Sequence, residues 1–514
     1  MKKSFITIFL AFLFISTSLF AQIVSTGSSG NWSATTTWVG GVVPSATDSV
    51  VISDGAKVTI DGNVTVTNIR VGSGVSGILQ FSKTAVCTLT VTGNIVAFPG
   101  SIIRPQSSGT GLGSIVQTAV LYGDLSFFGS SFNLRSGSAS GIPPTIGVLN
   151  FVFAGSANTT ISGNFSMNTN AFNSITINKT DGAKVILNNT IYVLSGSVLD
   201  PASNSIVNFV SGLIETGDNT LVLQSNRDSV FAGASPSSYV LGNYGTALSL
   251  ATKIFPVGDA NGYRPITIRS TDTSGSSTAQ GYHYVTASCI PGNADIGPSV
   301  LLGGIDKVSA VRYYSITYYQ GTTAKTSLSF NLFSPSYGSD DGVTSGNSNL
   351  MVAYSTDARA TWNGITQTKT HTTVVSDIPT TITPDSLQTS LVLNNAQSLF
   401  VALARVAGST ENSLGTPQGI VKESGMPKSF ELSQNYPNPF NPSTSISFSI
   451  AQSSVVRLRV YNVTGQEVAD LLNERKDAGI YKISFDGSKL SSGVYFYRLS
   501  TGNMDICKKM LMIK

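Results

Sequence analysis

Short segments in which apolar and polar residues alternate recur along almost the whole chain, separated by turns rich in glycine and asparagine. Val58 and Ile60 share one face of such a segment, the Asp-Gly-Asn turn at 61–63 ends it, and Val64 and Val66 resume the alternation. Successive side chains of a β-strand point to opposite faces, so this period of two predicts half-buried strands. Long helices need runs of strong helix formers, and the sequence has none. An all-β fold is therefore predicted.

The amino-acid composition narrows the range of partners. Charged residues make up 11% of the chain, against about a quarter in typical soluble domains. The formal net charge is only +4, and no basic stripe alternates with aromatic residues, so no nucleic-acid partner is expected. The three cysteines, Cys87, Cys289 and Cys507, are too scattered for a disulfide framework and are expected to be small buried apolar residues.

The first 21 residues have the pattern of a secretory signal peptide. Two lysines precede an apolar run over residues 5–20, and the small residue Ala21 follows it. Cleavage is predicted between Ala21 and Gln22. An uncleaved anchor helix is the alternative, but the run is shorter than the roughly 20 apolar residues that a membrane span needs. No later segment is long and apolar enough to cross a membrane, so no transmembrane helix is expected once the signal is removed.

A local repeat in residues 22–225 predicts a right-handed β-helix, in which successive coils stack on one another. Residues 75–79 match residues 210–214 in type, and Ser195 and Ser211 lie 16 residues apart, a spacing that suits one coil. Each coil buries its apolar face only when a neighbour stacks on it. A β-sandwich also yields short strands between turns and is the alternative.

The start of this region carries a second pattern, which combines tryptophan and glycine with a β-strand. Its residues are Gly30, Asn31, Trp32, Ser33, Trp38, Pro44, Asp48, Ser49, Val50, Val51, Ile52, Gly55 and Val58. The pattern resembles the opening segment of large secreted β-helix proteins, including those with a G8-type domain. The first coil of such a solenoid lacks a partner on one side, so Trp32 and Trp38 are expected to cover its open end.

The middle of the chain has longer and more aromatic strand patterns. Between residues 239 and 404 these are separated by Gly, Ser and Asp turns, which indicates a β-sandwich. Residues 405–429 contain few apolar residues and are predicted to be a linker. The strand at 311–319 places two tyrosine rings on each of its faces: Tyr313, Tyr314, Tyr318 and Tyr319. Core packing is the preferred interpretation of these rings, and an exposed pair that stacks on sugar rings is the alternative.

The last segment, residues 430–514, opens with a proline-rich entry, Asn-Tyr-Pro-Asn-Pro-Phe-Asn-Pro at 435–442. Each proline holds the preceding residue in an extended conformation, and asparagine side chains set turns, so a rigid extended lead-in is predicted. Alternating strands follow, with Ile446, Phe448 and Ile450 on one face. A small antiparallel sandwich of immunoglobulin-like type is therefore predicted.

The motifs of this segment closely resemble those of the type A C-terminal sorting domain of type IX secretion in Gram-negative bacteria. The matching positions are Pro437, Asn438, Pro439, Asn441, Pro442, Gly465, Gly479, Tyr481, Gly493, Tyr495, Lys508 and Lys509. The resemblance implies passage through the periplasm, recognition by the type IX machinery and crossing of the outer membrane. It also implies removal of the segment, followed by release of the protein or its attachment to the cell surface. A plain immunoglobulin-like module with a proline-rich entry is the alternative.

Motifs that would carry catalysis or hold a cofactor are weak in this sequence. Residues 72–77 fit the glycine pattern of dinucleotide sites, but a strand pattern follows where such a site needs a helix, so a turn is predicted. Two histidines, His283 and His371, are too few for a metal site without help from the fold. Asp340 and Asp341 lack the further acids of a calcium loop and are expected in a solvated loop. No catalytic residue, metal or cofactor is predicted.

These features favour a secreted or cell-surface structural or adhesive protein that binds polysaccharide or another surface through a long β face. Low charge and abundant hydroxyl and amide groups suit weak, multivalent polar contacts. The alternative is a polysaccharide lyase or glycoside hydrolase on the β-helix, and a glycosidase needs two carboxylates flanking the bond. The acids available in that region are Asp54, Asp61, Asp181, Asp200, Glu215, Asp218 and Asp228. The sequence pairs none of them, and a filament, matrix or surface-layer component is a third interpretation.

Overall fold

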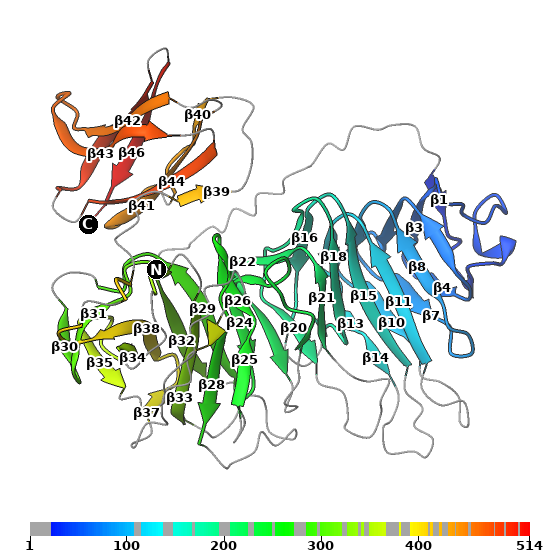
Figure 1. Cartoon of the computed structure of the whole chain (residues 1–514). Coiled ribbons are helices and arrows are strands. Elements are labelled where there is room, and N and C mark those ends of the chain that lie inside the picture. Colours follow the sequence, from blue (N-terminus) through cyan, green and yellow to red (C-terminus); the bar gives the residue numbers. More distant parts are fainter. Residues whose placement is uncertain are drawn as a thin grey trace, which may run out of the picture. The chain divides into compact units, whose positions relative to one another are not determined.

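A computed structural model of the chain consists almost entirely of β-strands (Figure 1). It describes residues 22–106, 115–136, 147–166, 170–194, 206–224, 231–248, 252–271, 284–295, 299–320, 326–337, 341–343, 349–365, 380–381, 391–409, 412–414, 421–423, 430–436, 438–450, 454–476, 479–487, 490–501 and 504–513. The 3-10 helix η1 (Thr35–Thr37) lies within these ranges, and no helix there has the length and apolar character that a bilayer span requires. The predicted signal peptide, residues 1–21, lies outside the described residues. The chain forms two compact units, Met1–Asn208 and Phe209–Lys514, and each is described by itself.

The first unit is built from three sheets of parallel strands. The first sheet holds β2 (Ser29–Asn31), β4 (Lys57–Ile60), β7 (Ile78–Phe81), β10 (Ile102–Pro105), β13 (Ser131–Asn133) and β17 (Asn170–Ala171). The second holds β5 (Val64–Val66), β8 (Thr88–Val91), β11 (Ile115–Leu121), β15 (Gly147–Gly155) and β18 (Ile175–Lys179), with the short β14 (Arg135–Ser136) antiparallel to β15. The third includes β1 (Gln22–Val24), β3 (Ser49–Ile52), β6 (Asn68–Val71), β9 (Ile95–Ala97), β12 (Leu125–Phe127), β16 (Thr159–Gly163) and β19 (Lys184–Leu187).

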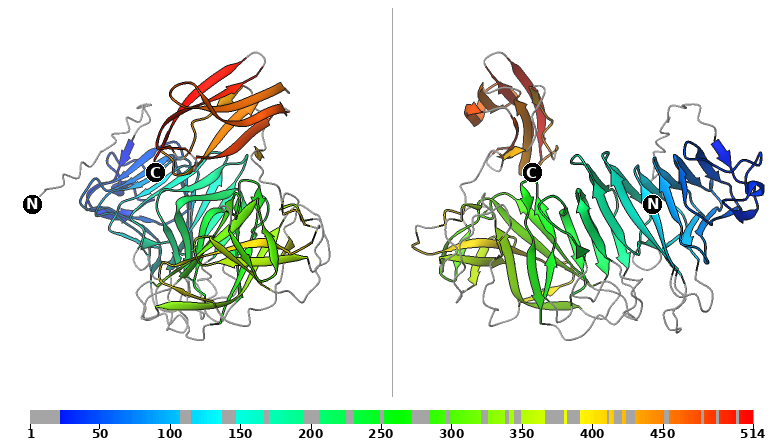
Figure 2. Two further views of the ribbon diagram at one scale, coloured as in Figure 1. Left: turned by 90° about the vertical axis from the view of Figure 1, so that its left-hand side faces the viewer. Right: turned by 45° about the vertical axis from the view of Figure 1, so that its right-hand side comes forward.

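The chain visits these three sheets in a fixed order. From β4 to β19 it passes through the first, the second and the third sheet and then returns to the first. We call one passage through the three sheets a circuit. Corresponding strands of successive circuits therefore lie side by side, as the parallel arrows in Figures 1 and 2 show. Consecutive strands of a circuit belong to different sheets, and each sheet grows by one strand per circuit.

Apolar side chains of neighbouring strands form buried rows inside this unit. Val50, Ile69, Ile95, Leu125 and Ile161 occupy matching positions in successive strands of the third sheet, and all five are buried. Full burial of one such side chain stabilises the fold by about 1.5–3 kcal/mol. Because parallel strands in register align the side chains of one face, the period of two in the sequence yields an apolar interior and a polar exterior. The predicted all-β fold is confirmed.

Side-chain oxygens at one turn of each circuit accept hydrogen bonds from the backbone of the next circuit. The N–H of Asn94 donates to Oδ1 of Asn68 at 2.8 Å, and the N–H of Asp124 donates to Oδ1 of Asn94 at 2.7 Å. The N–H of Thr160 donates to Oδ1 of Asp124, again at 2.7 Å. We call Asn68, Asn94 and Asp124 the side-chain ladder. It fixes the point at which each new circuit enters the third sheet.

The length of a circuit differs from the predicted repeat. Residues joined by the ladder are 26, 30 and 36 positions apart. The 16-residue spacing between Ser195 and Ser211 is therefore wrong as a repeat length, and Ser195 lies outside the described residues. The physical reason is that one circuit must supply three strands and three turns, which 16 residues of this strand length cannot span.

Two tryptophans pack together beside the first strands of the unit. Trp32 and Trp38 are both buried, with ring centroids 4.9 Å apart in an edge-to-face arrangement. Nε1 of Trp38 donates a hydrogen bond to the carbonyl oxygen of Trp32 at 2.8 Å. Trp32 directly follows β2, which is the terminal strand of the first sheet. This position agrees with the expected covering of the open end of the first circuit.

Much of the second unit is antiparallel. One group pairs β24 (Val240–Thr246), β29 (Tyr284–Pro291), β32 (Arg312–Tyr319), β38 (Ser398–Val406), β34 (Leu350–Ser355) and β35 (Thr361–Ile365), each with the next. Another pairs β25 (Thr252–Phe255), β28 (Ile266–Ser270) and β33 (Ser327–Tyr337), with β36 (Thr380–Thr381) and β37 (Leu391–Asn394) also on β33. Parallel pairing occurs between β22 (Leu213–Gln224) and β24. The remaining strands of this unit before the C-terminal segment are β23 (Phe231–Ala232), β26 (Val257–Asp259), β27 (Gly262–Tyr263), β30 (Val300–Leu302) and β31 (Ile305–Val308). Strand β20 (Ile191–Leu194) belongs to the first unit, and β21 (Val207–Ser211) begins at the end of it.

A buried ion-pair network lies among these strands. The guanidinium of Arg312 pairs with Asp259 at 2.9 Å and also with Asp341, and all three residues are almost fully buried. Asp341 therefore differs from the solvated loop residue expected from the sequence, because its charge is neutralised inside the protein by arginine. Asp340 lies outside the described residues.

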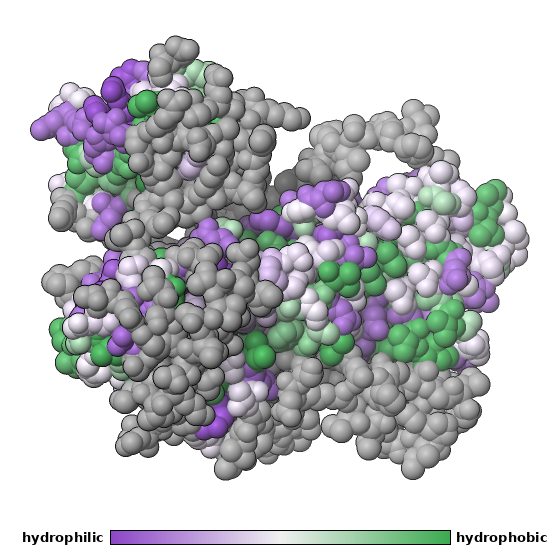
Figure 3. Space-filling model, viewed as in Figure 1, coloured by the Kyte–Doolittle hydropathy of each residue, from purple (hydrophilic) through white to green (hydrophobic). Residues whose placement is uncertain are grey.

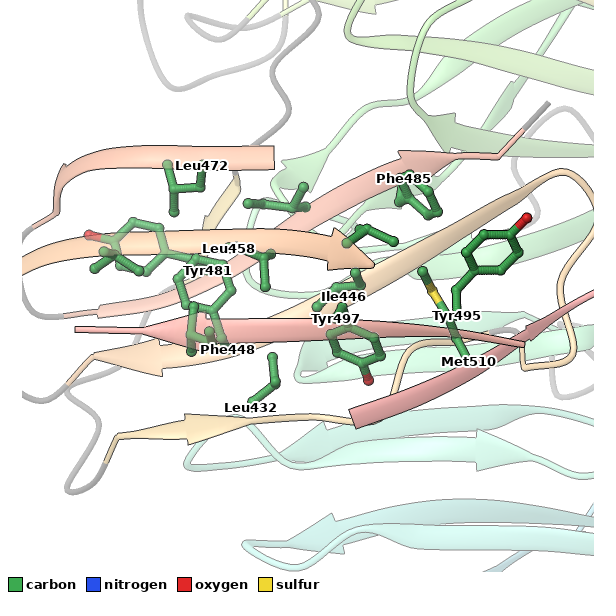
Figure 4. Packing of buried hydrophobic residues seen from close by; sticks show 14 of the residues in the cluster. Leu432, Ile446, Phe448, Leu458, Leu472, Tyr481, Phe485, Tyr495, Tyr497 and Met510 are labelled. Carbon is green, nitrogen blue, oxygen red and sulfur yellow. The ribbon is translucent and has the colours of Figure 1, made fainter. Parts of the chain in front are cut away.

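The C-terminal segment forms two four-stranded antiparallel sheets. One contains β39 (Val421–Glu423), β44 (Gly479–Asp486), β41 (Ser443–Ile450) and β40 (Glu431–Leu432), and the other contains β43 (Glu467–Lys476), β42 (Ser454–Tyr461), β45 (Gly493–Ser500) and β46 (Asp505–Met512). Side chains of both sheets share one hydrophobic core, and Figure 4 shows Phe448 of β41 and Leu458 of β42 among its members. Strand β39 belongs to the predicted linker, residues 405–429, as does the end of β38.

Candidate functional site

The proline-rich entry of the C-terminal segment lies along the last strand of the chain. Oδ1 of Asn438 accepts a hydrogen bond from the N–H of Leu511 at 2.9 Å. The N–H of Phe440 donates to the carbonyl of Leu511 at 2.9 Å, and the N–H of Ile513 donates to the carbonyl of Phe440 at 3.0 Å. The Phe440 ring is buried in the shared core. These contacts bring the two ends of the segment together although they are far apart in sequence.

A buried tyrosine holds the chain just before this entry. The N–H of Asn435 donates to the hydroxyl of Tyr497 at 2.8 Å, and that hydroxyl donates to the carbonyl of Ser433 at 2.8 Å. Burial raises the pKa of Tyr497 to about 12. The phenol therefore remains protonated at neutral pH and can donate and accept at the same time.

The predicted motif residues fall into exposed and structural groups. The exposed positions near the entry and on β46 are Asn438, Pro439, Asn441, Pro442 and Lys509, with Lys508 half-buried, and Pro437 lies outside the described residues. Tyr481 is buried and stacks on Phe448, and the Tyr495 hydroxyl donates to the carbonyl of Ser491 at 2.9 Å. Gly479 begins β44 and Gly493 begins β45.

One glycine of the motif has a clear conformational reason. Gly465 has φ +80°, in the left-handed region that glycine adopts most readily. Its N–H donates to the carbonyl of Asn462 at 3.0 Å, and Oδ1 of Asn462 accepts from the N–H groups of Thr464 and Gln466. The turn between β42 and β43 is thus fixed by this glycine and this asparagine.

Comparison with known proteins decides the nature of the segment. Residues 434–514 match a protein family described as the secretion system C-terminal sorting domain. They are a type IX secretion sorting domain. No curated protein and no solved structure matches the chain.

The sorting domain determines where the protein acts. It engages the type IX secretion machinery, which exports the protein to the cell surface or the surrounding medium. The sorting domain is cleaved from the protein during export. The surfaces that act outside the cell therefore belong to the residues that precede it.

One such surface is an open groove on the first sheet of the first unit, with a volume of about 440 Å³. Its lining residues are Ser29, Gly30, Asn31, Lys57, Thr59, Asp61, Gln80, Ser82, Lys83, Thr84, Ala85 and Gln106. They come from or directly follow β2, β4, β7 and β10, and most are polar. On the face of the first unit that Figure 3 presents, several hydrophobic patches alternate with hydrophilic residues.

Polar side chains cross the groove in a row. Asn31, Thr59, Gln80 and Arg104 occupy paired positions on β2, β4, β7 and β10. Nε2 of Gln80 donates to Oγ1 of Thr59 at 3.0 Å, and Nη2 of Arg104 donates to Oε1 of Gln80 at 3.4 Å. We call these four residues the polar row. These two hydrogen bonds link the side chains of Thr59, Gln80 and Arg104 across neighbouring strands.

Among the described residues that line the groove there is one carboxylate, Asp61, and both of its oxygens accept hydrogen bonds. Oδ1 of Asp61 accepts from the N–H of Ser33 at 3.1 Å, and Oδ2 accepts from the Ser33 hydroxyl at 2.5 Å. Asp61 is the only acid among the lining residues that the structure describes, so these residues do not supply the carboxylate pair that a glycosidase needs.

The other acids named from the sequence do not join Asp61 in the groove. Asp54 accepts hydrogen bonds from the hydroxyl and N–H of Ser73 and from the N–H of Ser76, which hold the pKa of its carboxyl well below the usual range. It thereby fixes the glycine-rich turn at 72–77, and β7 follows, as the sequence predicts. Asp181 is exposed in a turn. Glu215 and Asp218 belong to the second unit, and Asp200 and Asp228 lie outside the described residues.

Other candidate residues supply no second site in the described chain. His283 and His371 lie outside the described residues, and no group of three metal-binding side chains occurs within them. Cys87 and Cys289 are buried as expected, but Cys507 is exposed. The exposure of Cys507 corrects that expectation and follows from its place on the outward face of β46, where strand alternation directs it to solvent.

The tyrosines of β32 divide between core and surface. Tyr314 and Tyr318 are buried, as core packing requires, and Tyr313 is half-buried. Tyr319 stacks on Tyr284 with ring centroids 5.0 Å apart and an interplanar angle of 18°. Tyr313 and Tyr319 are six residues apart on one strand, about 20 Å, so they do not form a pair that could sandwich one sugar.

Sequence reasoning missed the polar row and the role of Phe440. Asn31, Thr59 and Arg104 lie at outward positions next to buried residues, so their alternation was visible, whereas Gln80 is itself buried. Their alignment across neighbouring strands could not be predicted from the sequence, because the circuits differ in length. Phe440 could have been singled out as the apolar residue within an otherwise polar, proline-rich entry.

Proposed function

We propose that the exported protein is a structural or adhesive surface protein that binds a polysaccharide through the groove of the first unit. The observation that supports this is the polar row, which aligns the exposed amide of Asn31 with the half-buried Thr59 and Arg104 along an open groove, while the buried Gln80 links Thr59 to Arg104. A polysaccharide offers hydroxyl groups at regular intervals, and repeated polar contacts give useful avidity even when each is weak. The single engaged carboxylate supports binding rather than hydrolysis.

We infer that the scaffold behind the groove is a right-handed β-helix. The parallel pairing and the repeated order of the three sheets support this inference. Crossovers between parallel strands of one sheet are right-handed in about 98% of cases, which supports the handedness. In this interpretation residues 22–225 are the β-helix, 239–404 a β-sandwich, 405–429 a linker and 430–514 an immunoglobulin-like sorting domain. The likeness of the region around Trp32 to G8-type proteins stays a prediction.

The experiment that tests binding compares two double variants of the purified protein on a glycan array. Asn31→Ala with Thr59→Val removes two members of the polar row. Thr65→Val with Thr90→Val changes two paired residues of β5 and β8, in the second sheet, and serves as the matched control. Binding lost in the first variant and kept in the control supports the proposal.

Two results would contradict this function. Equal glycan binding by both double variants would place the site elsewhere. Release of new reducing ends or unsaturated sugars from alginate, pectin or xylan would show that the protein is an enzyme, the alternative raised by the sequence.

We also propose how the chain is cleaved at its signal peptide and how its sorting domain is recognised. Residues 1–21 are a signal peptide, so N-terminal analysis of the exported protein should begin at Gln22. The type IX machinery binds the exposed entry residues around Asn438 together with Lys508 and Lys509 on β46. Replacement of both lysines by glutamine should leave the protein in the periplasm without unfolding the sorting domain, and normal export of that variant would remove the lysines from the recognition surface.

A further inference from the structure

We infer that the ligand of the groove is an anionic polysaccharide, one that carries carboxylate groups on its sugar rings. This inference rests on the proposed polysaccharide-binding function and narrows the class of ligand. It follows from three observations on the groove: its charge, the positions of its two lysines and the absence of aromatic rings among the lining residues that the structure describes.

The groove has an excess of positive charge. Lys57 and Lys83 both line it, and among the residues that the structure describes neither ammonium group has an ion-pair partner. The one acid in the lining, Asp61, has both oxygens hydrogen-bonded to Ser33. Arg104 adds a further cation at the end of the polar row. In a chain with only 11% charged residues, this local excess is a distinctive feature.

The two lysines stand on opposite sides of the polar row. Lys57 begins β4, two residues before Thr59 on the same face of the strand. Lys83 lies beyond the end of β7, three residues after Gln80. Because β4 and β7 are parallel and in register, one ammonium group lies before the row and the other after it. A sugar chain laid across the row would meet hydroxyl-binding groups in the middle and a cation on each side.

The described lining residues also include no aromatic ring, the group on which neutral sugars commonly stack. Aromatic rings offer flat apolar faces on which sugar rings can stack. Among the described lining residues none is aromatic, so hydrogen bonds and charge must supply the affinity. Since surface charges are screened by salt, the binding of an anionic polymer here should weaken as ionic strength rises.

The test measures binding of the purified protein to immobilised alginate, a polymer of sugar carboxylates, and to a neutral β-glucan at several salt concentrations. Alginate should bind more tightly, and its affinity should fall with salt. The double variant Lys57→Gln with Lys83→Gln should lose about tenfold in alginate affinity at low salt. The matched control, Arg70→Gln with Lys184→Gln, removes the same charge from the third sheet and should retain the affinity of the unmodified protein.

The outcomes separate this inference from the function on which it rests. Equal binding of alginate and neutral glucan, unaffected by the lysine variant but lost with Asn31→Ala and Thr59→Val, overturns the anionic ligand and keeps polysaccharide binding. An equal loss in the control variant overturns the inference as well, because the effect would then be one of net charge. Absence of binding to any glycan by a protein with native circular dichroism overturns both.

Discussion

Asn438 and Leu511 are joined by a hydrogen bond in which the side-chain oxygen of the asparagine accepts the backbone N–H of the leucine at 2.9 Å. The two residues are 73 positions apart, yet the contact aligns the proline-rich entry with the terminal strand. The proline-rich entry thereby covers part of the edge of β46. It lies next to the strand that carries Lys508 and Lys509.

Replacement of Asn438 by alanine should loosen the end of β46. The N–H of Leu511 loses its partner, at a cost of about 0.5–1.5 kcal/mol for one hydrogen bond. Faster hydrogen exchange at Leu511 and Ile513 would report the change, together with a smaller exported fraction in a bacterium that has type IX secretion. Asn473→Ala, another exposed asparagine of the sorting domain, is the control. Unchanged exchange at both amides would show that the contact does not hold the strand.

Tyr497→Phe should destabilise the sorting domain without removing any apolar contact. The hydroxyl of Tyr497 binds the N–H of Asn435 and the carbonyl of Ser433. Its loss removes the acceptor of the buried N–H of Asn435, at a cost of about 1–3 kcal/mol. The measurement is the urea midpoint of the sorting domain within the full chain. It is read from the sorting-domain peptides that a protease releases at each urea concentration. Tyr461→Phe, a half-buried residue of β42, is the comparison. Equal midpoints for the two variants would contradict the prediction.

Asn94→Ala should weaken the first unit at one step of the side-chain ladder. The N–H of Asp124 would lose the oxygen that it binds at 2.7 Å, which costs about 1–3 kcal/mol if no water replaces it. Hydrogen exchange should accelerate in β9 and β12 more than in β3. Ser126→Ala, on the outward face of β12, provides the control. Uniform exchange along the unit would argue against a local role for the ladder.

The stability of the first unit should increase with pH above neutrality because of Lys179. This lysine is almost fully buried, and its ammonium donates to the carbonyls of Ala154 and Ala157 and to the hydroxyl of Thr159 at 2.6–2.9 Å. Burial lowers the pKa of Lys179 from 10.5 to about 8. The unfolded chain therefore holds more protons between these two values, and the free energy of unfolding should rise across that window by up to about 3 kcal/mol.

The measurement for Lys179 compares the unmodified protein with Lys179→Met. Pulse proteolysis in urea, read from peptides of residues 147–194, gives the free energy of unfolding at pH 7.5 and pH 10. The free energy of unfolding of the unmodified protein, relative to that of Lys179→Met, should be larger at pH 10 than at pH 7.5. A constant difference, or a shift in the opposite direction, would rule out the buried ammonium as the cause.

The sequence predicted the kind of secondary structure well because alternation is a local signal. Val58, Ile60 and Val66 are buried as their spacing indicates, and the turn at 72–77 contains no helix. The sorting domain was also predictable, because its proline, glycine and tyrosine motifs resemble those of a known family, and the family match over residues 434–514 confirms that resemblance. Gly465, with its positive φ, is one of these motif residues.

Long-range alignment was not predictable from local patterns. The 16-residue spacing misled because Ser195 and Ser211 repeat a turn type, whereas the true circuit length depends on how much chain lies between three sheets. Asp341 was expected in solvent because its arginine partners are distant in sequence. The groove was missed for the same reason: Asn31, Thr59 and Gln80 come from three separate circuits, and only strand register brings them into one row.

The unequal circuits of the first unit have a consequence for how such a protein can change over time. The ladder anchors each return of the chain by its Asn or Asp oxygen, whether 26 or 36 residues have intervened. Lengthening a connection costs little entropy, since the penalty grows only with the logarithm of its length. Insertions between anchors can therefore accumulate without moving the neighbouring strands, which lets the outer surface diversify while the stacked interior is inherited unchanged.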